Sequence, residues 1–266
     1  MLKKLIQYDL KSMMRVFVLI HAAFLAICVC ARFLYMDRVN FHLPAERLIT
    51  PLAIAASLLI TLIVAVNLST WLLMAFRFYR NLFSGEGYLS WTLPASGPQH
   101  LLAKTISGYI CMLLDTCVIG LGILILFTSR NVTDSYRLIA PEMTEVLGMT
   151  VSRFAVYTFL FCILSCISTV VMTYFCITVG QLFPGHRVLC AIAAYFITYF
   201  VIQFLLLLVM AAFGYFPGYD YLDEYGLPLS HFLFGMLSIS TAMMLLATVI
   251  QYIVTHHIMK KNINLL

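Results

Sequence analysis

Long apolar runs separated by short polar segments dominate this sequence. A helix needs about 20 apolar residues to cross a bilayer core about 30 Å thick. Six runs reach that length, and each holds at most one charged residue: 16–34, 52–75, 105–127, 154–180, 188–213 and 231–255. The pattern predicts an all-α polytopic membrane protein with six transmembrane helices, forming a single membrane domain over residues 1–266.

The composition agrees with a membrane class. Hydrophobic residues make up 63% of the 266 residues and charged residues 10%, whereas soluble domains average about 45–50% and about 25%. All eight cysteines fall inside the apolar runs, without a CxxC pair or a Cys/His spacing typical of metal sites. We therefore interpret them as packing residues and expect no metal or cofactor in this chain.

The placement of Lys and Arg predicts the orientation, because cytoplasmic segments carry an excess of them. The N-terminus, the segments 76–104 and 181–187, and the C-terminal tail together hold ten basic residues. The other side holds six, counting Arg32 near the end of the first run. The first group has two acids and the second has eight. This bias predicts that both termini lie in the cytoplasm.

The polar segments differ in character. Residues 1–15 combine apolar positions at helical spacing with four Lys or Arg residues. They are expected to form an interfacial amphipathic helix, or else only a positive flank that fixes the topology. The segments 37–51 and 129–153 are interpreted as polar connectors. Residues 214–230, rich in Tyr and acids, form either a short re-entrant or interfacial segment before the sixth helix or a flexible acidic loop.

Asp115 is the acid that falls inside an apolar run. A carboxylate at that depth is costly in free energy unless it is partnered, so it is expected to face the bundle interior. Gly108, Cys111 and Gly122 share its helical face. The side chain either lines a substrate route or makes a structural hydrogen bond to a neighbouring helix. His21 in the first run is interpreted as a structural residue.

The fourth run carries a stripe of small and polar residues on one face, comprising Cys162, Cys166, Thr169, Thr173, Cys176 and Gly180. Small residues let helices approach closely in lipid, and this is the favoured interpretation. The alternative is a transport path lined by hydroxyl groups. The candidate route residues are accordingly Asp115, Asn67, Thr169 and Thr173.

No constellation typical of an intramembrane enzyme is present. The sequence has no GxSxG nucleophile, no HExxH zinc motif and no paired acids within the apolar runs. It also lacks the GxxxxGK[ST] phosphate loop, so we expect this chain not to be an enzyme. If ATP drives the protein, another polypeptide hydrolyses it.

The segment 76–104 is a polar interruption with a high density of aromatic residues. It holds Arg77, Arg80 and Lys104 together with the sequence Glu86-Gly87-Tyr88-Leu89, and then Leu93-Pro94 and Ser96. Over about thirty residues it resembles the first cytoplasmic loop of permease subunits of bacterial type-2 ABC exporters. In those proteins an aromatic-basic stretch precedes an EGYL core, an LP pair, and a Lys that opens the third helix.

The resemblance implies a permease that pairs with a second permease, identical or related, and with two copies of an ABC ATP-binding subunit that hold the ATP and Mg²⁺. The loop would form a short coupling helix docked on the ATPase, since aromatic and Arg side chains are typical interface anchors. The residues expected to dock are Arg80, Phe83, Glu86, Tyr88, Leu89 and Trp91. The alternative is an interfacial helix that only anchors the loop in lipid.

The expected function is therefore outward, alternating-access transport of an amphipathic substrate, such as a peptide, a lipid-like molecule or a drug, across a bacterial cytoplasmic membrane. Two alternatives stand beside it. The same fold could protect the cell against an antimicrobial peptide, or the chain could be a membrane sensor or interaction protein that transports nothing. No nucleic-acid partner is expected. The sequence leaves the substrate and the choice between homodimer and heterodimer open.

Overall fold

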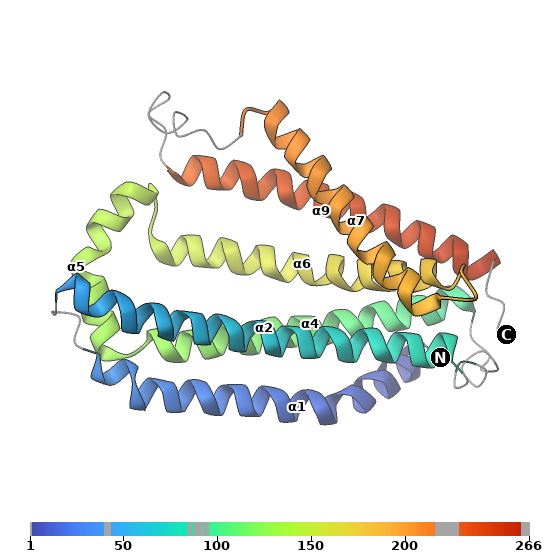
Figure 1. Ribbon diagram of the computed structural model, residues 1–266, viewed down its shortest axis with the longest axis horizontal. Helices are drawn as coiled ribbons and strands as arrows, with labels where there is room; N and C mark the ends of the chain where they lie inside the picture. Colours follow the sequence, from blue (N-terminus) through green and yellow to red (C-terminus); the bar gives the residue numbers. More distant parts are fainter. Residues whose placement is uncertain are drawn as a thin grey trace.

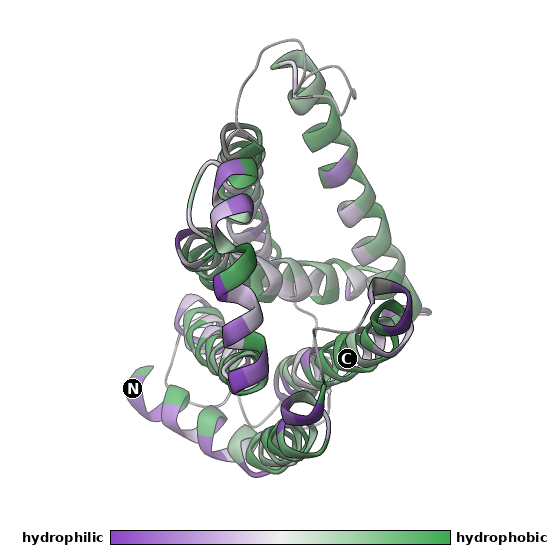
Figure 2. Cartoon of the chain, turned by 90° about the vertical axis from the view of Figure 1, so that its left-hand side faces the viewer, coloured by the Kyte–Doolittle hydropathy of each residue, from purple (hydrophilic) through white to green (hydrophobic). Residues whose placement is uncertain are grey.

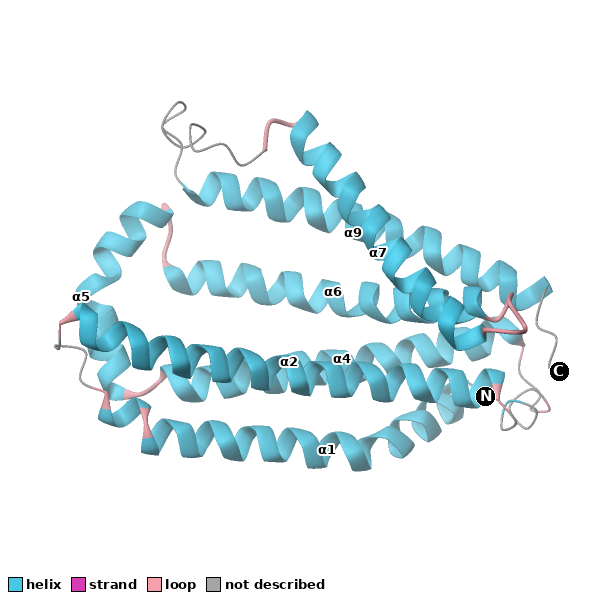
Figure 3. Ribbon diagram, viewed as in Figure 1, coloured by secondary structure: helices cyan, strands magenta, loops and turns pink. Residues whose placement is uncertain are grey.

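The computed structural model describes residues 2–39, 44–84, 87, 92, 96–215 and 229–261, with only the backbone at 45, 230 and 231. Within these residues the chain is helical and has no strands (Figure 3). The helices are α1 (Leu2–Leu34), the short 3-10 helix η1 (Met36–Arg38), α2 (Ala45–Phe83), α4 (Gly97–Phe127), α5 (Arg130–Leu147), α6 (Val151–Gly180), α7 (Arg187–Ala212) and α9 (Leu229–Lys261).

Six of the described helices are long and apolar enough to cross a membrane, namely α1, α2, α4, α6, α7 and α9. The prediction of an all-α polytopic membrane protein with six spans is confirmed at this level. Many large apolar side chains on these helices are exposed, as expected where lipid rather than protein covers them. Figure 2 views the helices end-on and shows mostly hydrophobic residues along them.

The six long helices lie side by side, with the connections gathered at two ends (Figure 1). The beginnings of α1, α4 and α7 and the ends of α2, α6 and α9 lie at one end, which we call the loop end. η1 and α5 lie at the opposite end, the α5 end. The ends of the described helices agree with the predicted grouping of the polar segments; which end faces the cytoplasm stays a prediction.

The first helix differs from the expectation. Residues 1–15 do not form a separate element, because the predicted amphipathic segment and the predicted span 16–34 are one continuous helix, α1. A helix of 33 residues is about 50 Å long at 1.5 Å per residue, which exceeds the bilayer core. The first turns of α1 diverge sideways from the bundle in Figure 2.

The segment 76–104 is also shorter as a loop than predicted. Residues 76–83 continue α2, and 97–104 already belong to α4. Gly97 and Pro98, which lie inside the predicted loop, form the first turn of α4. The Ser96 side chain and Gln99 form a reciprocal capping box, with the Ser96 amide 3.1 Å from Gln99 Oε1, and proline is well tolerated in a first helical turn. A separate coupling helix would lie in 85–95, mostly outside the described residues.

At its other end, α2 starts before Pro51, although the predicted span began after it. Pro51 is exposed and lies inside the helix. A proline removes one helix hydrogen bond. Because the Pro51 ring is exposed, it does not interfere with the packing of a neighbouring helix.

The predicted polar connector at 129–153 is wrong, because most of it forms α5. Ser129 caps the helix by accepting a hydrogen bond from the Val132 amide at 3.4 Å, and Gly148 ends it in the left-handed conformation (φ 71°). Asn131 Nδ2 donates to the Asp37 and Val39 carbonyl oxygens at 2.8 and 3.0 Å. The sequence pattern did not predict α5, because polar residues separate the apolar positions of this amphipathic helix.

The small-residue stripe of the fourth run lies on α6 and serves packing in this conformation. Cys166, Thr173, Cys176 and Gly180 are buried, and α6 packs against α4, α7 and α9. At Gly180 an added Cβ would lie 2.6 Å from the Arg187 carbonyl oxygen. The favoured interpretation, close helix packing, is therefore supported.

The expected re-entrant segment at 214–230 falls largely on 216–228, which lie outside the described residues. At its start, Gly214 adopts φ 76°, and the Tyr215 ring lies 6.0 Å from the Phe232 ring.

Candidate functional site

A hydrogen-bonded cluster of polar side chains lies where α1, α2 and α4 meet. We call it the inner cluster: His21, Asn67, Thr70 and Asp115. Asp115 Oδ1 lies 2.7 Å from His21 Nε2 and accepts a 2.7 Å hydrogen bond from the Thr70 hydroxyl. Its Oδ2 accepts from Asn67 Nδ2 at 2.9 Å. Asp115 is fully buried and His21 is 4% exposed.

The helix faces explain why these residues meet. On α1 the buried residues follow each other at steps of three or four: Asp9, Met13, Phe17, His21, Phe24 and Cys28. On α4 the predicted inward face is confirmed, since Gly108, Cys111, Asp115 and Gly122 are all buried. The two faces pack along each other, and a Cβ at Gly122 would lie 2.8 Å from Phe24 Cζ. Glycine therefore permits this approach.

A second polar contact joins the same helices near the loop end. It is the loop-end ion pair, formed by Asp9 of α1 and Lys104 of α4. Their side chains are 8% and 11% exposed. Asn81 Nδ2 donates to Asp9 Oδ1 at 3.4 Å, and the Arg77 guanidinium donates to the Ser12 carbonyl oxygen at 3.2 Å. The end of α2 is thus bonded to the first turns of α1.

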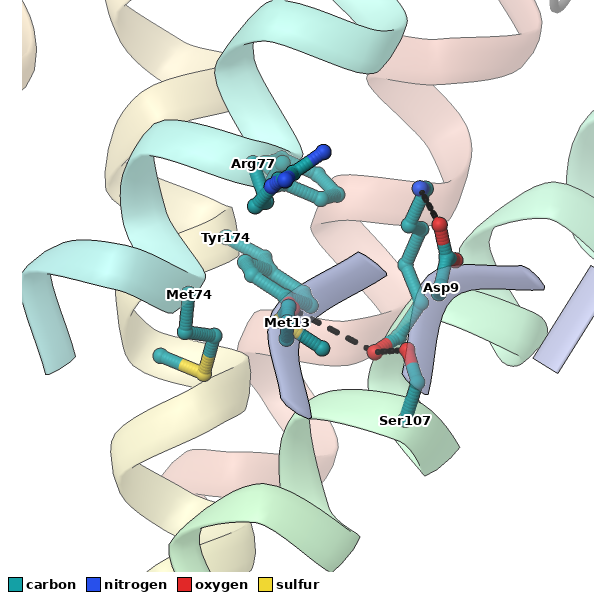
Figure 4. A pocket seen from close by; sticks show the side chains of 8 residues that line it. Asp9, Met13, Met74, Arg77, Ser107 and Tyr174 are labelled. Carbon is teal, nitrogen blue, oxygen red and sulfur yellow. Dashed lines mark hydrogen bonds and ion pairs between the residues drawn. The ribbon is translucent and has the colours of Figure 1, made fainter. Parts of the chain in front are cut away.

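A small cavity adjoins the loop-end ion pair (Figure 4). Its volume is about 10 Å³, close to the lower limit for one water molecule. Tyr174 of α6 donates to the Lys104 carbonyl oxygen at 3.3 Å, and Ser107 donates to the same oxygen at 3.0 Å. The cavity is lined by residues from α1, α2, α4 and α6: Asp9, Met13, Met74, Arg77, Phe78, Lys104, Ser107 and Tyr174.

The four helices around this cavity pack tightly. An added Cβ at Gly108 would lie 2.7 Å from the Tyr174 hydroxyl oxygen and 3.1 Å from Met74 Sδ. The rings of Phe78 and Tyr174 stack with their centroids 3.8 Å apart. The core at the loop end is therefore close-packed and leaves no space for a sizeable ligand next to the ion pair.

The structure brings together two of the four candidate route residues. Asn67 and Asp115 bond directly in the inner cluster. Thr173 lies elsewhere and accepts from Trp71 Nε1 at 2.8 Å, while Thr169 donates to the Ser165 carbonyl oxygen of its own helix at 3.0 Å. None of the four lines the cavity of Figure 4. In this conformation the bonding of Asp115 favours its structural alternative.

The expected docking residues are described only in part. Arg80 is exposed, and its guanidinium carbon lies 6.0 Å from the centroid of the Phe76 ring. Phe83 is only 9% exposed and packs against Phe78, with ring centroids 5.7 Å apart. In this conformation Phe83 therefore belongs to the packed core of the helices and is not exposed for docking. Glu86, Tyr88, Leu89 and Trp91 lie outside the described residues.

The sequence pattern did not predict these two pairings. His21 is interpreted as structural without Asp115 being named as its partner, and Asp9 counts only among the acids that indicate the orientation. Lys104 is named only in the orientation count and in the resemblance of 76–104 to a coupling loop. A signal existed, because Asp9 falls on the same period-four stripe of α1 as His21. Two ionisable residues on the buried face of one helix require partners on the next.

The described parts of the chain contain no group of three His, Cys, Asp or Glu side chains that could hold a metal ion. The fold and the two polar centres thus define the class as a multi-pass helical membrane protein, with six candidate spans and charged contacts between its first and third spans. A comparison with family models, curated proteins and solved structures found no match to this chain.

Proposed function

We propose that the protein is the permease subunit of an ATP-driven exporter in a bacterial cytoplasmic membrane. A separate ATP-binding subunit, present in two copies, docks on the loop between α2 and α4, and a second permease completes the assembly. The resemblance of residues 77–104 to the coupling loops of such permeases supports this proposal. ATP and Mg²⁺ belong to the partner subunits.

The observation that carries the proposal is the loop-end ion pair. Lys104 belongs to the helix that follows the loop, and Asn81 and Arg77 belong to the helix that precedes it. Both helices are bonded to the first turns of α1. A force applied to the loop therefore acts on three spans through one buried ion pair and two partly buried hydrogen bonds. A coupling loop requires such a connection.

The first turns of α1 support the proposed orientation. Lys3, Lys4, Lys11 and Arg15 are exposed on them, whereas Asp9 and Met13 face the bundle. Basic side chains on one face suit the headgroup layer of an anionic cytoplasmic leaflet. In this arrangement the loop end faces the cytoplasm, where an ATP-binding subunit can reach it.

The proposed cargo is amphipathic, such as a peptide, a lipid-like molecule or a drug. The described spans bury few ionisable groups: Asp9, His21, His100, Lys104 and Asp115 are the buried charged or imidazole side chains. Each carboxylate among them already has a hydrogen-bonded partner. A route for a small ion would require further polar groups, whereas an amphipathic molecule can follow helix surfaces that face lipid.

Co-purification tests the proposal. The tagged chain, extracted from the membranes of its own cell in a mild detergent, is expected to carry a stoichiometric subunit with a phosphate-binding loop. The double variant Tyr88→Ala/Trp91→Ala is expected to lose that subunit while inserting normally. Phe183→Ala is the matched control, because Phe183 is an exposed aromatic residue in another turn of the loop end.

The outcome separates the candidate functions. If no ATP-binding subunit accompanies the wild-type chain, the exporter proposal fails, and a sensor or interaction protein becomes the better interpretation. If the subunit is retained equally by all variants, the loop is not the docking site.

A further inference from the structure

The hydrogen bonds of His21 determine where its ring carries hydrogen. Nδ1 lies 2.8 Å from the Phe17 carbonyl oxygen, and a carbonyl oxygen only accepts hydrogen bonds. Nδ1 is therefore protonated. In a neutral imidazole this leaves Nε2 with a lone pair, and that lone pair points at Asp115 Oδ1 from 2.7 Å.

An ionised carboxylate is also only an acceptor. Two acceptors at 2.7 Å repel each other, so this geometry requires one hydrogen between Nε2 and Oδ1. The other contacts of Asp115 cannot replace it. Asn67 Nδ2 donates to Oδ2, and the Thr70 hydroxyl donates to Oδ1 from its own oxygen atom, so neither lies between Nε2 and Oδ1.

We propose that His21 and Asp115 form a proton-binding site, closed to water, at the contact of α1 with α2 and α4. The ligand is one proton, and it makes the pair neutral overall whether it rests on the ring or on the carboxyl group. Without it the pair would carry a net negative charge in the membrane interior, where charge is costly. The inference concerns this chain alone and is independent of the proposed export function.

The surroundings of the pair isolate the proton. Two buried thiols interact with Asp115, those of Cys111 on α4 and Cys166 on α6. Arg77 on α2 is two helical turns from Thr70, and Asp9 and Lys104 are about three turns from His21 and Asp115 along their helices. None of these groups bonds to the pair in the contacts described above, and the pair is buried. Asn67, which donates to Asp115 Oδ2, is exposed on α2, whereas His21 and Asp115 are buried. We expect the pair to lose its proton when α1 moves away from α4.

Spectroscopy at pH 8 tests the assignment, because a free imidazole has a pKa of about 6.5 and is neutral there. The full chain is placed in lipid nanodiscs with ¹⁵N-labelled histidine. We expect either a histidinium signal that His21→Gln removes, or the infrared band of a protonated carboxyl group that Asp115→Asn removes. If the wild-type chain shows neither, the proposal is overturned.

Asp115→Asn is the matched control for the proton. Its amide can donate to His21 Nε2 and accept from Asn67, so the contacts persist without a shared proton. Thr70 then turns to the Val66 carbonyl oxygen, which already lies 3.3 Å away. Both signals are expected to be absent, with the ring neutral and Nδ1 protonated. A neutral wild-type ring with its hydrogen on Nε2 would contradict the assignment.

A pair of glycine variants tests whether helix contact retains the proton. Gly122→Ala drives a methyl group against Phe24 and to 3.1 Å from Cys28 Sγ, both on α1. Gly120→Ala places the same group 3.4 Å from Phe159 Cε2 of α6, an ordinary contact. At pH 8, Gly122→Ala is expected to lose the signal of the shared proton and Gly120→Ala to keep it. Retention in both variants would contradict closure by the contact of α1 with α4; if Gly122→Ala does not fold, the spectra of wild type and Asp115→Asn still decide the proposal.

Discussion

The loop-end ion pair and the inner cluster join the same two helices, α1 and α4, but in different surroundings. Asp9 and Lys104 lie near the end of the bundle, beside a cavity and several basic residues. His21 and Asp115 lie about three helical turns deeper, with every polar atom of the carboxyl group bonded to protein. Water can hydrate the first pair once it separates, whereas separation of the second requires the helices to part. The loop-end ion pair can therefore transmit a movement of the loop to α1. The His21–Asp115 pair instead holds α1 against α4.

The largest expected effect is at the inner cluster. Asp115→Ala leaves the His21 ring, the Asn67 amide and the Thr70 hydroxyl without their acceptor. Removing one partner of a buried pair costs about 3–5 kcal/mol, and we expect a loss of that order in thermal unfolding in nanodiscs. Asp115→Asn should lose only about 1 kcal/mol, because it keeps hydrogen bonds. An Asp115→Ala variant as stable as wild type would show that the cluster does not stabilise the bundle.

The effect at the loop-end pair is expected to be smaller. Lys104→Met leaves the Asp9 carboxylate with Asn81 alone, and rehydration from the end of the bundle offsets part of the loss. We expect a decrease of about 2 kcal/mol, measured in the same unfolding assay. Lys11→Met is the control, because Lys11 is exposed on the same end of α1. Equal effects for the two lysines would mean that burial does not distinguish them.

Helix packing between the two centres should show the smallest effect. Gly108→Ala places a methyl group 2.7 Å from the Tyr174 hydroxyl and 3.0 Å from Val170 Cγ1, and such overpacking costs about 1–2 kcal/mol. Gly120→Ala meets only an ordinary contact and should be neutral or slightly stabilising. Melting temperatures of the two variants test the difference, and a stabilised Gly108→Ala variant would contradict the close packing of α2, α4 and α6.

The sequence predicted the spans well, because about 20 apolar residues in a row have few alternatives to a membrane helix. It predicted the first and last residues of the helices less well. The predicted loop 76–104 includes Ser96-Gly97-Pro98-Gln99, although these residues begin α4 with a capping box. α5 was missed because its apolar positions are spread among polar ones. Whether such a segment forms a helix depends on the residues that it packs against in the folded protein.

The polar centres were only half predictable. The helical face of Asp115 indicated an inward position, and Asn67 was named with it. That His21 and Thr70 complete the cluster depends on the rotation of α1 and α2 about their axes, which single-helix patterns do not determine. In the same way, Lys104 and Asp9 are 95 residues apart in the chain, and their pairing follows from the packing of two helices.

ATP hydrolysis by the purified assembly tests the central claim most directly. The tagged chain is isolated from its native membranes in mild detergent, and hydrolysis is measured beside the Tyr88→Ala/Trp91→Ala variant at equal yield. A permease driven through the loop between α2 and α4 predicts hydrolysis with the wild-type chain and its loss with the variant. The same rate for both, or no hydrolysis above a mock purification, would contradict it.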